Sequence, residues 1–127
     1  MYHSAGGMVM DIKGKKAIVF GGTSGIGLAT CQELQARGAE VVAVSRDPNK
    51  AGTSIDYIRL AAVDARDSDA VSAFFESEGK VDILISSATG GSRAFGPFLE
   101  MDIDGFKGSF DKLWGYSNVV RYGTAKL

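Results

Sequence analysis

The order of apolar and polar residues along the chain predicts short strands that alternate with helices. Nearly continuous apolar runs predict four strands, at residues 17–20, 40–45, 57–63 and 81–86. Apolar residues at helical spacing predict helices at residues 28–37, at residues 68–78 and from about residue 103 onward. Strands and helices that alternate through short connections indicate a parallel α/β sheet.

Each predicted helix has one apolar face. The residues of these faces are Ile26, Ala29, Thr30 and Leu34, then Val71, Phe74 and Phe75, then Phe106, Phe110, Leu113 and Trp114 together with Ser117. Glycines at 38 and 79 follow the first two helices, as glycines do at helix ends. Residues 49–57 are polar and irregular, which leaves little room for a full helix between the second and third strands.

A glycine-rich turn joins the first strand to the first helix, with glycines at 21, 22, 25 and 27. Gly21 and Gly25 permit a positive φ and let a phosphate approach the main chain, and Gly27 lets the helix pack close to the strand. The free N–H groups and the dipole at the helix N-terminus then favour an anion. The turn has no Lys followed by Ser or Thr, so it does not match a P-loop. It predicts a pyrophosphate site, with an ordinary glycine-rich turn as the alternative.

Length and composition exclude several classes of protein. The 127 residues suffice for one modest domain, and 14 Lys and Arg residues nearly balance 15 Asp and Glu, without a basic block for nucleic acid. No apolar run approaches the ~18 residues of a membrane span, and no metal site is predicted. Cys31 has no partner for an internal disulfide and is expected in the core, which fits a reducing, cytoplasmic setting. Residues 1–13, with a solvated His3, are expected to form a flexible tail rather than a signal peptide.

Five short stretches, taken together, resemble the short-chain dehydrogenase/reductase family over residues 13–123. They are Phe20-Gly21-Gly22-Thr23-Ser24-Gly25-Ile26-Gly27 for the family's T-G-x-x-x-G-x-G, Ser45-Arg46, Asp64-Ala65, Ser86-Ser87-Ala88-Thr89 for N-N-A-G, and Asp111-Lys112-Leu113-Trp114-Gly115 for D-V-N-L-x-G. The chain departs from the family pattern where Phe20 replaces Thr and where both Asn and the final Gly of N-N-A-G are replaced. Lys112 takes the place of the active-site Asn.

The resemblance implies a Rossmann-type, doubly wound parallel sheet over residues 14–127 that binds a nicotinamide dinucleotide. The implied cofactor-binding residues are Gly21, Thr23, Ser24, Gly25, Ile26, Gly27, Ser45, Arg46, Asp64, Ala65, Ser86 and Ala88, and the implied catalytic position is Lys112. It further implies hydride transfer to or from a small carbonyl or alcohol, and assembly as a homo-oligomer. A cap for nearby backbone is the alternative role for Asp64.

The end of the second strand predicts which cofactor is preferred. An acidic residue there would bind the ribose of NAD(H), whereas an Arg accommodates the 2′-phosphate of NADP(H). This chain has Ser45 followed by Arg46, whose guanidinium can bind a phosphate bidentately. We therefore expect NADP(H), with a solvated loop charge as the alternative for Arg46.

The family's catalytic groups are a Ser and a Tyr-x-x-x-Lys pair that follow a fifth strand. Tyr122 and Lys126 match the spacing of the pair, but they fall on the last predicted helix with no fifth strand before them. We interpret them as a helix-surface pair at i, i+4. The chain is thus expected to correspond to the N-terminal half of a reductase, inactive alone, with its sheet stopping after the fourth strand and the following helix. A non-catalytic nucleotide-binding or assembly module, or another type of α/β nucleotide binder, remains an alternative.

This interpretation predicts the roles of two surfaces, one that borders the substrate and one that favours association. The loop of residues 89–98, with Ser92, Arg93 and Phe95, is expected to border the substrate. The strand at residues 81–86 is expected at an edge of the sheet, and the last helix is expected to expose its apolar stripe. Unpaired edges and exposed apolar patches favour association, so we expect the chain to self-associate.

Overall fold

The computed structural model describes residues 11–51, 55–89 and 94–127. Residues 1–10 with His3, and Ser92 and Arg93 of the expected substrate loop, lie outside the described residues. The elements are β1 Lys16–Phe20, α1 Gly25–Ala36, β2 Glu40–Ser45, the 3-10 turn η1 Pro48–Ala51, β3 Arg59–Ala62, α2 Ser68–Glu78, β4 Ile83–Ser86, the 3-10 turn η2 Phe98–Glu100, α3 Ile103–Gly108 and α4 Asp111–Thr124. The predicted alternation of strands and helices is confirmed, and the described residues between β2 and β3 form only the 3-10 turn η1.

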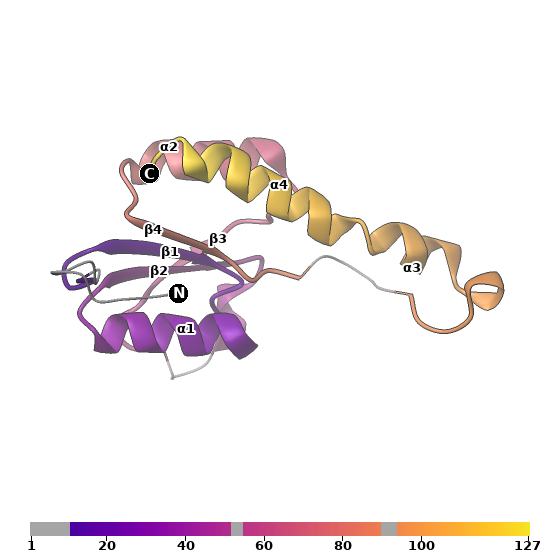
Figure 1. Cartoon of the computed structure of the whole chain (residues 1–127), viewed down its shortest axis with the longest axis horizontal. Coiled ribbons are helices and arrows are strands. Elements are labelled where there is room, and N and C mark those ends of the chain that lie inside the picture. Colours follow the sequence, from indigo (N-terminus) through magenta and orange to yellow (C-terminus); the bar gives the residue numbers. More distant parts are fainter. Residues whose placement is uncertain (1–10, 52–54, 90–93) are drawn as a thin grey trace, which may run out of the picture.

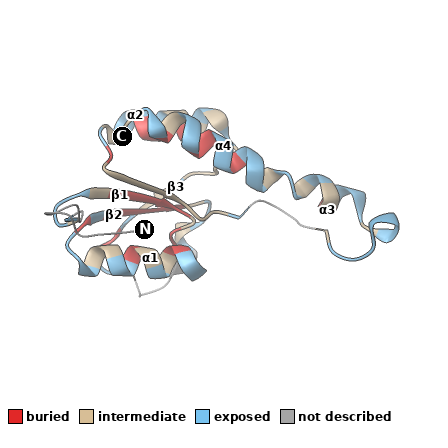
Figure 2. Cartoon of the chain, viewed as in Figure 1, coloured by how far each residue is buried: buried red, intermediate tan, exposed pale blue. Residues whose placement is uncertain are grey.

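The four strands form one parallel sheet in the order β3-β2-β1-β4. Helix α1 covers one face of the sheet, and α2 and α4 lie side by side over the other face (Figure 1). The sheet is therefore doubly wound, as expected. Strand β4 pairs only with β1 among the described strands, which confirms its predicted place at an edge. Figure 2 shows that burial is greatest in the central strands β1 and β2.

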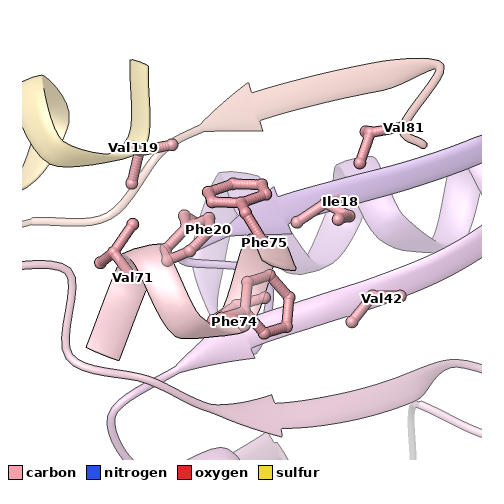
Figure 3. Packing of buried hydrophobic residues seen from close by; sticks show 9 residues of the cluster. Ile18, Phe20, Val42, Val71, Phe74, Phe75, Val81 and Val119 are labelled. Atoms are coloured by element: carbon pink, nitrogen blue, oxygen red, sulfur yellow. The ribbon is translucent and has the colours of Figure 1, made fainter. Parts of the chain in front are cut away.

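The alternation of side chains along β1 and β2 divides the core into two clusters. Ile18 and Phe20 point to α2 and α4, whereas Ala17 and Val19 point to α1. In the first cluster the Phe20 ring lies 5.8 Å from the rings of both Phe74 and Phe75 (Figure 3). The predicted inward residues of α2, which include Val71, are all buried, because the helix packs the face that its apolar spacing indicates.

Helix α1 differs from the prediction in its start and in part of its buried face, whereas Leu34 of the predicted face packs against the core. It begins at Gly25 rather than at residue 28, and Ile26 of the predicted inner face is 82% exposed. The buried residues are Gly27 and Cys31. A Cβ on Gly27 would overlap the carbonyl oxygen of Gly21, so small residues, not large apolar ones, bring this helix close to the sheet. The predicted burial of Cys31 is confirmed, and burial raises the pKa of its thiol to about 11.

The long helix predicted from residue 103 is two helices, α3 and α4, with a break at Ser109 and Phe110. Helix α3 begins where Asp102 accepts a hydrogen bond from the N–H of Gly105, and it extends away from the sheet (Figure 1). The buried residues of α4 are Gly115, Asn118, Val119 and Gly123. The predicted apolar stripe is exposed, with Phe110, Leu113 and Trp114 each more than half accessible.

Glu78, at the end of α2, forms ion pairs with residues at the amino ends of β1 and β3. Its carboxylate lies 3.0 Å from Nζ of Lys16 on β1, and it accepts hydrogen bonds from both terminal nitrogens of Arg59 on β3. The hydrogen bond from Arg59, reinforced by Lys16, lowers the pKa of Glu78 to about 2. Its folded pKa is thus below its ordinary value of 4.5, so its stabilisation is complete above about pH 4.5 and is lost as pH falls toward 2.

Glu78→Gln is expected to lower the free energy of unfolding by about 2 kcal/mol at pH 7, since it leaves two cations without their carboxylate. Urea unfolding at pH 7 and pH 3 should show this difference shrinking at the lower pH. Glu76→Gln is the matched control, because Glu76 is exposed and pairs with Lys126 at the surface, where the expected change is below about 0.5 kcal/mol. A Glu78→Gln effect of equal size at both pH values would contradict the assigned charge.

Candidate nucleotide-binding cleft

A cleft of about 1130 Å³ opens at the carboxyl ends of the parallel strands. Its walls come from the glycine turn after β1, the residues that follow β2, β3 and β4, and the first turns of α4. All of the site residues expected from the sequence line it, from Gly21 in the glycine turn to Lys112 on α4. The fold brings these side chains together because parallel strands end at the same edge of a sheet.

The glycine turn has the backbone geometry that its sequence predicts. Gly21 has φ +80° and Gly25 has φ +52°. The N–H of Gly21 donates to the carbonyl of Val44 at 2.8 Å, and a Cβ on Gly21 would lie 2.6 Å from the backbone nitrogen of Ala88. A Cβ on Gly25 would meet no atom within 4 Å. Gly21 is thus needed for packing inside the turn, while Gly25 borders open space in the cleft.

The end of β4 is tied to the same turn by Ser87. Its backbone N–H and its Oγ both donate to the carbonyl of Phe20, at 2.8 Å and 3.0 Å. The chain therefore keeps a hydrogen-bonding side chain at a place where the family motif has an Asn. Ser86 and Ala88, on either side, line the cleft.

The N-terminus of α1 opens on the cleft, and neither its cap residue nor its first turn offsets its positive end. Ser24 occupies the cap position without a side-chain hydrogen bond to the helix, and the first turn has no acidic residue. The first N–H groups of a helix have no partner within it. This end of α1 is therefore suited to an anion.

Ser45 and Arg46 form the next part of the wall. The Oγ of Ser45 is buried, and within the described part of the chain it has no hydrogen-bond partner. Arg46 is exposed and makes no ion pair with any residue that the structure describes. A hydroxyl and a guanidinium thus face the cleft with unused hydrogen-bonding capacity.

Beyond β3, Arg66 bridges two carboxylates. It donates to Asp64 from Nε at 3.0 Å and from Nη2 at 2.9 Å, and its Nη1 lies 3.3 Å from Asp111 at the start of α4. The hydrogen bond from Arg66 holds the pKa of Asp64 below its usual value, with a small contribution from Arg46. Asp64 also accepts the backbone N–H of Arg66, but the cap of α2 is Asp67. Asp64 therefore caps the backbone of the turn that contains Arg66, but it does not cap α2.

Helix α4 contributes Lys112 and, one turn later, Tyr116 to the cleft wall. Sequence reasoning missed Tyr116, although its spacing from Lys112 places both on one face. It likewise missed Arg66 and Asp111. Tyr122 and Lys126 do not line the cleft: Tyr122 packs against the core, and Nζ of Lys126 lies 3.1 Å from Glu76.

No cluster of three His, Cys, Asp or Glu side chains in the part of the chain that the structure describes is arranged to hold a metal ion. None of its helices has the length and apolar character needed to cross a membrane.

Comparison with known proteins gives consistent matches. A family model described as "short chain dehydrogenase" matches residues 15–125. L-xylulose reductase of Mesocricetus auratus is 36% identical over 107 residues, which is 82% of this chain and 43% of that protein. A solved "short chain dehydrogenase/reductase family protein" superposes with a TM-score of 0.79 at 30% identity, covering 92% of this chain and 51% of the other. A short-chain type dehydrogenase/reductase from Mycobacterium ulcerans has the same fold, with a TM-score of 0.83, 23% identity and coverage of 92% and 48%. The chain thus spans about half the length of these proteins or less.

Proposed function

We propose, from the premise that the chain belongs to the short-chain dehydrogenase/reductase family, that its cleft binds NADP(H) for hydride transfer to or from a small carbonyl or alcohol. The observation that carries the proposal is that the buried Ser45 hydroxyl, which has no hydrogen-bond partner among the described residues, and Arg46 line the cleft together with the anion-favouring N-terminus of α1. A hydroxyl and a guanidinium fit a 2′-phosphate, whereas the ribose of NAD(H) would favour an acidic residue at this place.

Different residues of the cleft are proposed to bind different parts of the cofactor. The turn from Gly21 to Gly27 and the first N–H groups of α1 hold the pyrophosphate, and Ser45 and Arg46 hold the 2′-phosphate. The other proposed contacts are those of Asp64 and Ala65 with the adenine side, and of Ser86 and Ala88 with the nicotinamide side. The bound cofactor supplies or accepts the hydride. Lys112 places a cation in the cleft, where it favours negative charge on a substrate oxygen.

We assign no acid–base role to Tyr122 and Lys126, because neither lines the cleft and Lys126 is paired with Glu76. The described chain on its own is then expected not to oxidise NADPH in the presence of carbonyl compounds. This placement keeps a second candidate function open, that of a non-catalytic nucleotide-binding module. Turnover of NADPH that disappears in Tyr122→Phe would contradict both the assignment and the second candidate.

The proposal is tested most simply by thermal unfolding with added nucleotide. A ligand that binds only the folded state stabilises it by about 2.7 kcal/mol at a concentration of 100 times Kd. NADPH should therefore raise the melting temperature more than NADH does at the same concentration. Equal rises would contradict the preference for NADP(H), and the absence of any rise would contradict nucleotide binding.

We also propose self-association through the exposed apolar stripe at the start of α4, including its cap residue Phe110, and through the edge of the sheet at β4. Phe110, Leu113 and Trp114 are 57%, 64% and 55% exposed, and an apolar patch of this kind favours burial against another surface. Sedimentation velocity at micromolar concentration should show dimers or larger species, and a stable monomer would contradict the proposal. The proposed setting is the cytoplasm, consistent with the single buried Cys31.

A further inference from the structure

Helix α4 holds the connection between β3 and α2 through one face. The four residues of α4 that contact this connection, at spacings i, i+3, i+4 and i+7, are Asp111, Trp114, Gly115 and Asn118. The connection itself lines the cleft at residues 64–66. One wall of the proposed nucleotide site is thus held by α4, whose first turns also line the cleft and whose Asn118 lies about 50 residues after its partners.

Asn118 is the buried centre of this attachment. It is 3% exposed, its Nδ2 donates to the carbonyl of Ala65 at 2.9 Å, and its Oδ1 accepts the hydroxyl of Ser68 at 2.9 Å. A buried amide with both ends bonded fixes its partners more firmly than exposed contacts do. Asn118 therefore ties the carbonyl of Ala65 and the first residue of α2 to the same point on α4.

Two neighbouring residues of α4, Trp114 and Gly115, also contact residues 65 and 66. Nε1 of Trp114 donates to the carbonyl of Arg66 at 3.1 Å, although the ring is largely exposed. Gly115 faces Ala65 so closely that a Cβ on it would lie 3.2 Å from the Ala65 Cβ. Two consecutive carbonyls of the cleft wall, those of Ala65 and Arg66, are thus bonded to α4.

We propose that Asn118 is a positioning residue for the nucleotide: it fixes residues 64–66 from α4, so that affinity for the adenosine half of the cofactor depends on a side chain outside the cleft. The inference rests on the proposed function, because that function assigns Asp64 and Ala65 to the adenine side of the cofactor. Coupling of this kind is reciprocal, so bound nucleotide must also hold α4 more firmly in place.

The test measures the affinity of adenosine 2′,5′-bisphosphate, which contains only the adenosine half, by calorimetry on the whole chain. Asn118→Ala is expected to weaken binding about tenfold. Trp114→Phe keeps an aromatic ring at an exposed position but removes the hydrogen bond to Arg66, and a smaller loss of about threefold is expected. Because Trp114 is not part of the core, this variant tests the proposal even if Asn118→Ala does not fold.

Val119→Ala is the matched control. Val119 is fully buried on the same helix, in the apolar cluster against which Ala65 packs, but its side chain makes no hydrogen bond to residues 64–66. The variant therefore separates a loss of packing from a loss of the hydrogen bonds. It should lower the melting temperature and leave the affinity unchanged. Hydrogen exchange should show slower exchange of α4 amides in the wild type when the bisphosphate is bound.

Two results would overturn the inference alone: variants of Asn118 and Trp114 that bind as tightly as the wild type, or a loss of affinity in Val119→Ala as large as in Asn118→Ala. A wild type that binds neither the bisphosphate nor NADPH would instead overturn the proposed function, and the inference with it. The two failures are therefore distinguishable.

Discussion

Gly27→Ala is expected to weaken NADPH binding by about 3 kcal/mol, or roughly 150-fold, because the added methyl group overpacks the turn that holds the pyrophosphate. Its Cβ would overlap the carbonyl oxygen of Gly21 and come within 2.6 Å of the Ser87 Oγ. These are backbone and strand-end atoms, so the turn must move and the N-terminus of α1 must move away from the cleft. Calorimetric titration of NADPH measures the loss.

Gly79→Ala is a suitable control for the Gly27 variant. Gly79 has φ +73° and open space around its Cβ position, and it does not line the cleft. Its substitution should cost about 1 kcal/mol of stability through backbone strain and leave NADPH affinity unchanged. If Gly27→Ala binds NADPH like the wild type, the turn has no role in holding the cofactor.

Arg46→Ala is expected to weaken NADPH binding by about 1.5–3 kcal/mol, the range for a hydrogen bond to a charged group, and to leave NADH binding nearly unchanged. In affinity this is about 10- to 150-fold. The reason is that Arg46 has no ion pair within the described part of the chain, so its guanidinium is available to the 2′-phosphate. Parallel titrations with both cofactors provide the comparison.

Arg37→Ala is the matched control for Arg46. Arg37 is also an exposed arginine, but it lies outside the cleft and pairs with Glu33 on α1. It removes the same net charge, so any general electrostatic effect on the anionic cofactor should appear in both variants. Equal losses for NADPH and NADH in Arg46→Ala would show that Arg46 does not recognise the 2′-phosphate.

The parts of the fold that the sequence predicts well are those where local pattern and tertiary packing agree. In α2 the apolar spacing of Val71, Phe74 and Phe75 is the face that packs on the sheet, and Gly79 ends the helix. In α1 they disagree, because close approach to the glycine turn requires the small residues Gly27 and Cys31 on the inner face. Apolar spacing cannot predict a contact that is made by the absence of a side chain.

The close contacts of the glycine turn also change the result expected for a substitution at Gly21. From the sequence alone, Gly21→Val would remove cofactor binding before it unfolds the protein. The contact of Gly21 with the backbone of Ala88 shows that the added methyl groups would also displace the end of β4. Gly21 is therefore a poor site for separating binding from folding, and the exposed Arg46 is the preferred variant for that purpose.

The attachment of α4 to the connection between β3 and α2 has no local signal in the sequence. Asn118 bonds to residues 50 and 53 positions earlier, and a polar residue within an apolar helical pattern gives no indication of its partner. The cleft residues of the glycine turn and the strand ends were predictable, because these segments carry recognisable motifs, whereas Arg66, Asp111 and Tyr116 were missed. Their placement in one cleft was then a consequence of the parallel sheet.

The most direct test of the central claim is a calorimetric titration of the unmodified chain with NADPH and with NADH under the same conditions. We predict that NADPH binds at least about tenfold more tightly, a difference of about 1.4 kcal/mol. Equal affinities, or tighter binding of NADH, would contradict the assignment of the cleft to NADP(H).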